Sequence, residues 1–157
     1  MILFMSRQET TSLSKIFVTL QFLILSYFVL FHPIHQPFGP QDVVAWTIII
    51  AGCTLGIFAL LSFRKSSFRI VPEPNDNATL ITDGPYAFIR HPMYTALILL
   101  TFGLFINYPI PSHFLAFSLL FITLNLKLTY EEKLLLRMFP RYQKYQASTH
   151  KLFPFVY

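Results

Sequence analysis

Long apolar stretches without charged residues dominate the chain and predict helices that cross a membrane. No Asp, Glu, Lys or Arg occurs in residues 16–41, 43–63 or 91–126. About 20 consecutive apolar residues are enough to span a bilayer as a helix. The first two stretches therefore predict membrane spans at residues 13–31 and 43–63.

The third stretch is interrupted by prolines and predicts two shorter spans. Pro109 and Pro111 cannot both lie inside one continuous helix. We therefore expect a hairpin with spans at residues 92–108 and 112–128. Both are short for about 30 Å of hydrocarbon, which favours tilt or local thinning of the bilayer, and a buried re-entrant pair also fits. The predicted fold class is an all-α integral membrane protein with four transmembrane helices.

Basic residues predict how these helices are oriented. The 12 Lys and Arg residues lie before the first span, between the second and third, and from the end of the fourth onward. With four spans, all these segments fall on one side, which the positive-inside rule makes cytoplasmic. We therefore expect cytoplasmic N- and C-termini, a long cytoplasmic loop before the third span and a cytoplasmic C-terminal segment. A bacterial inner membrane or the endoplasmic reticulum fits this topology.

The amino-acid composition agrees with a membrane protein and excludes several kinds of soluble protein. Hydrophobic residues make up 54% of the 157 residues and charged residues 12%, against roughly 25% charged in soluble domains. The single cysteine, Cys53, excludes an internal disulfide, and no two glycines have the G-x-G spacing of a dinucleotide loop. The net charge of +5 indicates contact with anionic membrane lipids, with no role for nucleic acid.

Two smaller motifs have structural explanations. Gly52 and Gly56 form a G-x-x-x-G pattern that predicts close packing of the second span against another helix. His32 and His35 have a spacing that can hold a metal, but no third ligand is near them in sequence. A proline-rich turn explains them better, and no metal site is predicted.

The link between the second and third spans is the first candidate for chemistry. Connections this long are usually functional or disordered, and the apolar and aromatic residues in 80–89 argue against disorder. Residues 79–82 predict a short strand, and residues 83–85 predict a turn.

Arg90-His91-Pro92-Met93-Tyr94 lies where this link re-enters the membrane. Pro92 suits the first turn of a helix and keeps the preceding residue non-helical. Backbone amides at such a helix start are unpaired and favour an anion. The same side chains are also ordinary anchors at a membrane interface, so both interpretations stay open here.

Charged residues at the end of the fourth span are the second candidate. If the helix continues, Lys127 and Glu131 share one face, and Glu131 and Glu132 lie about 100° apart. Adjacent acids at the membrane edge are unfavourable without a cationic partner. A positively charged ligand and a solvated helix face are the two explanations. The basic, aromatic tail 139–145 suits a segment that lies on anionic lipid or folds back over a site.

Both candidate segments resemble the isoprenylcysteine carboxyl methyltransferase family, to which phospholipid methyltransferases are related. The matching motifs are Gly84-Pro85-Tyr86-x3-Arg90-His91-Pro92-x-Tyr94 and Glu131-Glu132-x2-Leu135-x3-Phe139-x2-Tyr142-x2-Tyr145, with a closing Phe153-Pro154. The resemblance covers residues 64–157, and the upstream spans agree only in hydropathy. It implies one membrane methyltransferase domain over residues 1–157 that takes a methyl group from S-adenosyl-L-methionine.

The resemblance also implies roles for individual residues. The implied cofactor contacts are Ala78, Thr79, Leu80, Ile81, Tyr86, His91, Pro92, Met93, Tyr94 and Glu131. Lys127 stands at the acceptor-contacting position, where the family usually has Arg, and it keeps the charge without the bidentate fork. Ala96 and Pro140 stand where glycines are common in the family.

Physical chemistry is consistent with these roles. Glu131 can meet a cationic part of the cofactor, His91 its carboxylate or adenine, and the ring of Tyr86 or Tyr94 its adenine or sulfonium. The transfer is an in-line displacement, so alignment matters most. Lys127 suits a lipophilic carboxylate, such as a prenylated cysteine, which is already ionised.

Three alternatives remain at this point. A phosphatidylethanolamine amine has to lose a proton before methylation, and Glu132 is the candidate base. A non-catalytic four-span protein would use the same motifs as interface anchors. A membrane reductase of the steroid-reductase type would need a nicotinamide site.

Overall fold

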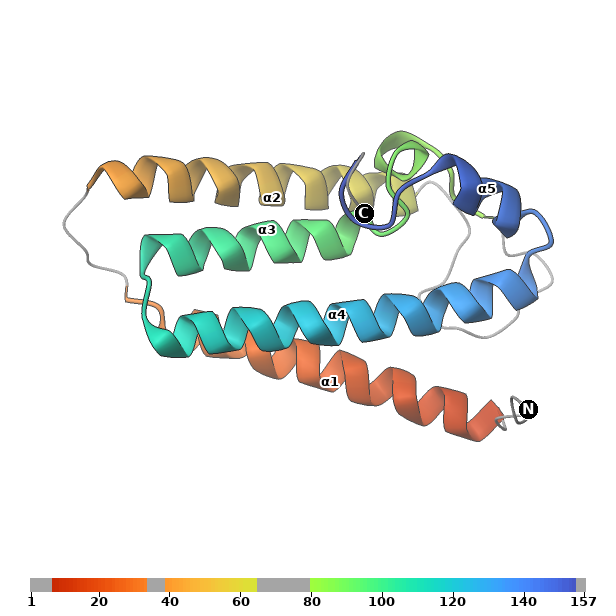
Figure 1. The fold of residues 1–157 in the computed structure, drawn as a ribbon, viewed down its shortest axis with the longest axis horizontal. Coiled ribbons are helices and arrows are strands. Elements are labelled where there is room, and N and C mark those ends of the chain that lie inside the picture. The colour runs from red at the N-terminus through yellow and green to blue at the C-terminus, as the bar shows by residue number, and fades with distance from the viewer. Residues whose placement is uncertain (1–6, 34–38, 65–79, 155–157) are drawn as a thin grey trace.

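The computed structural model describes residues 7–33, 39–64 and 80–154, whose regular secondary structure is entirely helical. The elements are α1 (Arg7–Phe31), α2 (Pro40–Arg64), the 3₁₀ helix η1 (Gly84–Ala87), α3 (Pro92–Asn107), α4 (Pro111–Met138) and α5 (Tyr142–Ser148). Figure 1 shows the four long helices side by side, with η1, α5 and the C-terminal segment together at one end. This end, called the α5 end below, also holds the first turn of α3 and the last turns of α4.

The apolar helices match the predicted spans in position, and three of them are long enough to cross a membrane. Ser12–Phe31 in α1, Pro40–Ser62 in α2 and all of α4 qualify by length and hydropathy. The remaining apolar helix, α3, has 16 residues and is therefore about 24 Å long at 1.5 Å per residue. The break between α3 and α4 falls at the two prolines, which confirms the hairpin. Crossing by α3, and hence the count of four spans, stays a prediction.

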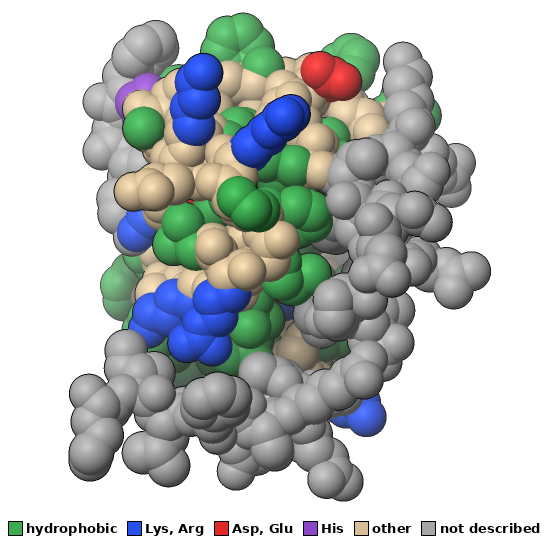
Figure 2. Space-filling view, turned by 90° about the vertical axis from the view of Figure 1, so that its right-hand side faces the viewer, with side chains coloured by type: hydrophobic (Ala, Val, Ile, Leu, Met, Phe, Trp, Pro, Cys, Tyr) green, Lys and Arg blue, Asp and Glu red, His purple; other side chains and the backbone are tan. Residues whose placement is uncertain are grey.

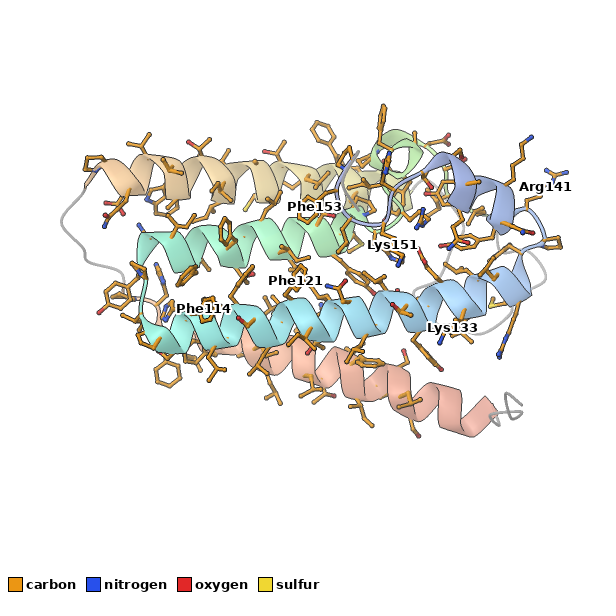
Figure 3. All side chains as sticks on the ribbon, viewed as in Figure 1. Phe114, Phe121, Lys133, Arg141, Lys151 and Phe153 are labelled. Atoms are coloured by element: carbon orange, nitrogen blue, oxygen red, sulfur yellow. The ribbon has the colours of Figure 1, made fainter. Side chains whose placement is uncertain are left out.

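Charge is distributed unevenly along the bundle. Lys and Arg side chains gather over the α5 end in Figure 2. In Figure 3, Lys133, Arg141 and Lys151 lie at this end, whereas Phe114 lies near the opposite end of α4. Under the positive-inside rule this arrangement favours a cytoplasmic α5 end.

Small residues bring α2 and α3 into close contact. A Cβ atom on Gly52 would lie 3.0 Å from the Ala96 carbonyl oxygen and 3.0 Å from the Leu100 amide nitrogen. On the α3 side, a Cβ atom on Gly103 would lie 2.9 Å from the Ala45 carbonyl oxygen. The two backbones therefore touch at these positions, which confirms the close packing predicted from the G-x-x-x-G pattern.

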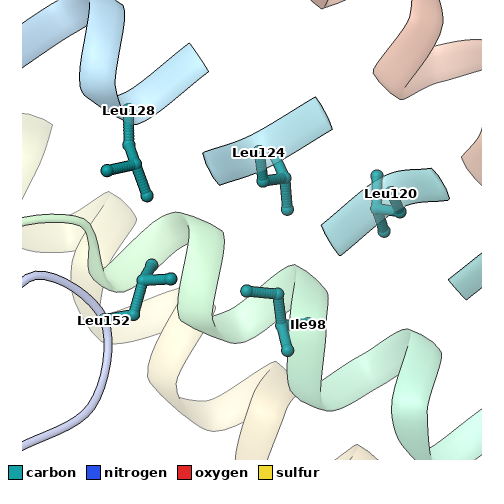
Figure 4. Packing of buried hydrophobic residues seen from close by; sticks show 5 residues of the cluster. All are labelled: Ile98, Leu120, Leu124, Leu128 and Leu152. Atoms are coloured by element: carbon teal, nitrogen blue, oxygen red, sulfur yellow. The ribbon is translucent and has the colours of Figure 1, made fainter. Parts of the chain in front are cut away.

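A leucine stripe joins α4 to α3 and to the C-terminal segment (Figure 4). Leu120, Leu124 and Leu128 recur every four residues, lie on one face of α4 and are completely buried. They pack with Ile98 of α3 and with Leu152, which is also completely buried. The chain after α5 is thus part of the core.

The strand predicted at residues 79–82 is wrong for the residues that the structure describes there. Leu80, Ile81 and Thr82 have no regular structure, and Thr79 lies outside the described ranges. A strand requires a hydrogen-bonding neighbour, and the C-terminal segment pairs elsewhere, through one parallel bridge between Ile89 and His150. The predicted turn at residues 83–85 is confirmed, because the Tyr86 amide donates to the Asp83 carbonyl at 3.3 Å and this turn forms the start of η1.

A chain of hydrogen bonds ties all four long helices together at the end opposite α5. His113 of α4 is fully buried, with Tyr27 OH 3.2 Å from its Nδ1 and His32 Nδ1 3.3 Å from its Nε2. His32 Nε2 lies 3.0 Å from Asn107 Oδ1, and the Asn107 amide donates to Asp42 of α2. One set of protons satisfies every contact with both imidazoles neutral.

His32, one half of the histidine motif in the sequence, is a member of this chain. Both ring nitrogens of His32 have protein partners, and the described residues contain no cluster of three or more His, Cys, Asp or Glu side chains. His35, the other half of the sequence motif, lies outside the described ranges.

We predict that Gly52→Leu separates α2 from α3 and lowers stability, although leaving glycine would by itself favour a helix. The new side chain would meet backbone atoms of α3 that cannot move independently, at a cost of about 1–3 kcal/mol. Cys53→Leu is the matched control, because Cys53 is exposed on the same helix. Thermal unfolding in detergent measures both variants, and equal Tm values would contradict the close packing.

Candidate active site

A hydrogen bond between Tyr94 and Glu131 joins the start of α3 to the end of α4. The Tyr94 hydroxyl lies 2.7 Å from each carboxylate oxygen of Glu131. Tyr94 is in the first turn of α3, which begins at Pro92 after the non-helical His91. The two segments singled out in the sequence therefore meet at the α5 end of the bundle.

The imidazole of His91 lies against the same pair. Its ring stacks on that of Tyr94, with centroids 5.3 Å apart and an angle of 6° between the planes. Nδ1 lies 3.9 Å from Glu131 Oε2, and Nε2 lies 3.4 Å from Glu132 Oε1. The second contact lacks hydrogen-bond geometry, so Nε2 is a buried ring nitrogen without a hydrogen-bond partner among the described residues. Nε2 therefore faces the buried Arg90–Glu132 pair, whereas Nδ1 lies on the side of Glu131.

Lys127 places a buried positive charge next to these side chains. It lies one helical turn before Glu131, and its Nζ atom is 5.0 Å from the centre of the Tyr94 ring. The ammonium donates one hydrogen bond, 3.1 Å long, to Gln21 Oε1 of α1. Lys127 is 8% exposed, and no ion pair within 4.0 Å involves it in the described part of the chain.

Glu132 has a different set of partners from its neighbour. Arg90 Nε donates to Glu132 Oε1 at 2.6 Å, and Gln146 Nε2 donates to Oε2 at 3.2 Å. Both side chains of the Arg90–Glu132 pair are at least 93% buried. Both carboxylate oxygens are thus occupied, and a carboxylate held by a guanidinium accepts a further proton poorly. This geometry does not favour the predicted role of Glu132 as a base.

The C-terminal strap, residues 142–154, covers the start of α3. Arg90 also donates through its guanidinium to the carbonyl oxygens of Gln146, at 3.0 Å, and Thr149. The backbone amides of Arg90 and His91 donate hydrogen bonds to carbonyl oxygens of the strap, at 2.8 Å and 3.1 Å respectively. The sequence led us to expect free amides here, which is wrong for these two. Both amides are hydrogen-bonded because the strap folds back over them.

Further bonds hold the strap on both sides. The Thr95 hydroxyl donates to the Leu152 carbonyl at 2.7 Å, and the Tyr145 hydroxyl donates to the Tyr86 carbonyl at 2.6 Å. Tyr86 itself lies in η1, after Gly84, whose φ of +62° is readily adopted only by glycine. Burial raises the pKa of the Tyr86 phenol to about 12, so this ring is neutral at physiological pH.

The structure brings together some of the sequence-predicted residues and not others. His91, Tyr94, Lys127 and Glu131 form one cluster, and Pro92 is buried beneath it. Met93 is 38% exposed, and Leu80 and Ile81 are half-buried. Ala78 and Thr79 lie outside the described ranges.

Two contributors were missed by sequence reasoning. Arg90 was noted in the motif without a role, although two adjacent acids at a membrane edge already required a cation. Gln21 was not noted at all. A polar amide inside an apolar span was the signal for it.

Comparison with protein families identifies the chain. Residues 43–142, which make up most of the chain, match the phospholipid methyltransferase family. The protein belongs to the phospholipid methyltransferase family. No curated protein sequence matches it. The family relationship implied by the sequence motifs is confirmed, and the family together with the apolar helices indicates an integral membrane methyltransferase.

The region that matches the phospholipid methyltransferase family leaves out both ends of the chain. It begins in the first turn of α2, includes η1, α3 and α4, and ends at Tyr142. Helix α1, with Gln21, and most of the C-terminal strap lie outside it. Lys127 and Glu131 therefore come from the shared region, whereas part of their surroundings comes from segments beyond it.

We predict that Arg90→Gln destabilises the protein by about 3–5 kcal/mol, because it leaves the Glu132 carboxylate buried without a cation. The strap also loses its guanidinium bonds, so the C-terminus becomes more sensitive to protease. Thermal unfolding and limited proteolysis measure the two effects. Arg141→Gln removes an exposed arginine beside the strap and is the control. If the two variants behave alike, Arg90 does not fasten the strap.

Proposed function

We propose that the protein is an S-adenosyl-L-methionine-dependent membrane methyltransferase whose cofactor site is formed by His91, Tyr94 and Glu131. The observation that supports this best is the hydrogen bonding of Tyr94 to both oxygens of Glu131, with the ring of His91 stacked on that of Tyr94. Methyltransferases of this family generally use that cofactor.

The residues present fit the chemical groups of this cofactor. The Glu131 side chain is 33% exposed and offers a carboxylate to a cationic group, while the Tyr94 hydroxyl fixes its orientation. The ring of Tyr86 offers a face for stacking or for a cation. The ring of Tyr94 already contacts His91 and Lys127, so its hydroxyl and the two neighbouring side chains define one edge of the proposed site. When bound, the cofactor supplies an electrophilic methyl group on a sulfonium.

Further contacts follow from the family motifs. We propose that Pro92, Met93, Leu80 and Ile81 border the same site, as the motif positions imply. Ala78 and Thr79, which the motif positions also imply, lie outside the described ranges.

We propose a lipophilic carboxylate, such as a prenylated cysteine, as the methyl acceptor. Lys127 supports this assignment, since a buried ammonium that has no ion pair with another described residue suits an anion. Methylation of a carboxylate forms an O–C bond, breaks a C–S bond and releases no proton. No base is needed, which agrees with the engagement of Glu132 by Arg90 and Gln146. The residues then contribute alignment and exclusion of water.

Phospholipid amines are the second candidate acceptors, and the matched family carries phospholipids in its description. A phosphatidylethanolamine carries a phosphate that suits Lys127 equally well. Its ammonium must lose a proton before it can attack, and Glu132 is the carboxylate proposed for that step. The two acceptors thus differ in whether a base takes part.

We further propose that α3 crosses the membrane as the third of four spans and that the site faces the cytosol. The basic residues around the α5 end support this orientation. Membrane lipids are the proposed partners of the apolar outer faces, where Phe22, Leu23, Val29 and Ile50 are each more than 60% exposed.

We predict that Glu131→Gln abolishes measurable binding of S-adenosyl-L-methionine while the protein stays folded and inserted. The variant keeps the shape of the side chain and removes its charge. Tyr94→Phe, which loses only the hydroxyl, weakens binding about tenfold, or about 1.4 kcal/mol. Isothermal titration calorimetry in detergent measures both. Lys133→Gln, an exposed neighbour on α4, is the control, and unchanged affinity in Glu131→Gln would remove Glu131 from the site.

We predict that purified protein with methyl-labelled S-adenosyl-L-methionine transfers the label to prenylated cysteines as a base-labile ester. The assay includes phosphatidylethanolamine and a total lipid extract in parallel. Label that is stable to base in a lipid headgroup would instead assign the phospholipid amine. Absence of transfer to every acceptor, together with absence of saturable cofactor binding, would contradict the enzyme assignment.

A further inference from the structure

We infer that Gln21 of α1 and Lys127 of α4 together bind the anionic group of the methyl acceptor, so that Gln21 is a specificity-determining residue. The inference rests on the proposed methyl transfer for the identity of its ligand. It assigns a role to α1, which lies outside the residues that match the family.

The hydrogen bonding of Lys127 is incomplete for a buried cation. An ammonium has three N–H donors, and the described residues use one of them, in the 3.1 Å bond to Gln21. The ring of Tyr94 contributes a weaker attraction through its face. A buried charge without an ion pair is costly, so the remaining donors provide a strong attraction for an anion.

Gln21 is placed to share that anion. Its oxygen already accepts from Lys127, and its amide NH₂ group has no hydrogen bond to another described residue. A carboxylate or a phosphodiester presents two oxygens, which suits one N–H from the ammonium and one from the amide. The arrangement therefore recognises a two-oxygen anion better than a neutral headgroup.

The surroundings of Gln21 suit a lipid. Helix α1 runs along α4 (Figure 1), and Phe17, one turn before Gln21, contacts Tyr130 with ring centroids 6.3 Å apart. Ile24 and Leu25, one turn after it, pack against the apolar core cluster. The amide thus lies on an otherwise apolar stripe between two helices, where an acyl or prenyl chain finds apolar contacts.

The spacing along α4 matches a two-ligand reaction. Lys127 and Glu131 are four residues apart on one face, which is about 6 Å along the axis. Tyr94 contacts both of them, since its hydroxyl binds Glu131 and its ring lies under Lys127. An anionic acceptor at Lys127 and a cationic donor at Glu131 are then neighbours across one tyrosine ring.

The test uses N-acetyl-S-farnesylcysteine, its uncharged carboxamide and vesicles containing phosphatidylethanolamine as probes. Gln21→Leu removes the amide, and Gln21→Glu supplies a carboxylate that pairs with Lys127 and repels an anion. We expect KM for the farnesylcysteine to rise about tenfold in Gln21→Leu and further in Gln21→Glu. The affinity for S-adenosyl-L-methionine stays unchanged. Thr19→Leu, at an exposed position of α1, keeps the wild-type KM.

Equilibrium binding of each probe without cofactor separates this inference from the proposed function. Preference of the wild type for the carboxylate over the carboxamide, lost in Gln21→Glu, supports the subsite even if no methyl transfer occurs. The same loss for phosphatidylethanolamine assigns the anion to a lipid phosphate. If both variants lower Tm but bind all probes as the wild type does, Gln21 only satisfies Lys127 and the inference is overturned.

Discussion

Two adjacent carboxylates at the end of α4 organise the molecule because a helix turns them toward different partners. The rotation of about 100° between consecutive residues directs Glu132 to Arg90 and the strap, and Glu131 to Tyr94. The Glu132 carboxylate is buried, and both of its oxygens accept hydrogen bonds, whereas the Glu131 side chain is 33% exposed. Glu132 therefore helps to hold the C-terminal strap in place, and Glu131 remains accessible at the candidate site.

The strap and the site are coupled through His91. Its backbone amide is held by the strap, its ring stacks on Tyr94, and its Nε2 atom faces the Arg90–Glu132 pair. The hydrogen bonds that hold Arg90 and the strap in place therefore also position the His91 ring, which borders the proposed cofactor site. Charge is concentrated at this end, whereas the opposite end is joined by a histidine chain that needs no charged imidazole. This polarity is consistent with the proposed orientation, in which the site faces the cytosol.

Much of this arrangement follows from local patterns. Charge-free stretches locate the apolar helices, Pro109 and Pro111 separate α3 from α4, and the spacing of Lys127 and Glu131 puts them on one face. The long-range contacts do not follow from such patterns. Nothing local shows that Arg90 pairs with Glu132, that the strap consumes the amides before α3, or that Gln21 meets Lys127, 106 residues away. These contacts depend on how distant segments pack. The same holds for residues 80–82, which pair with no strand among the described residues.

A structure of the protein with S-adenosylhomocysteine, the demethylated form of the proposed cofactor, tests the central claim most directly. The account predicts one bound molecule at the α5 end, with its charged amino group near Glu131 and its nucleoside against the rings of His91 and Tyr94. A nucleoside bound at the opposite end, or away from these three residues, would contradict it.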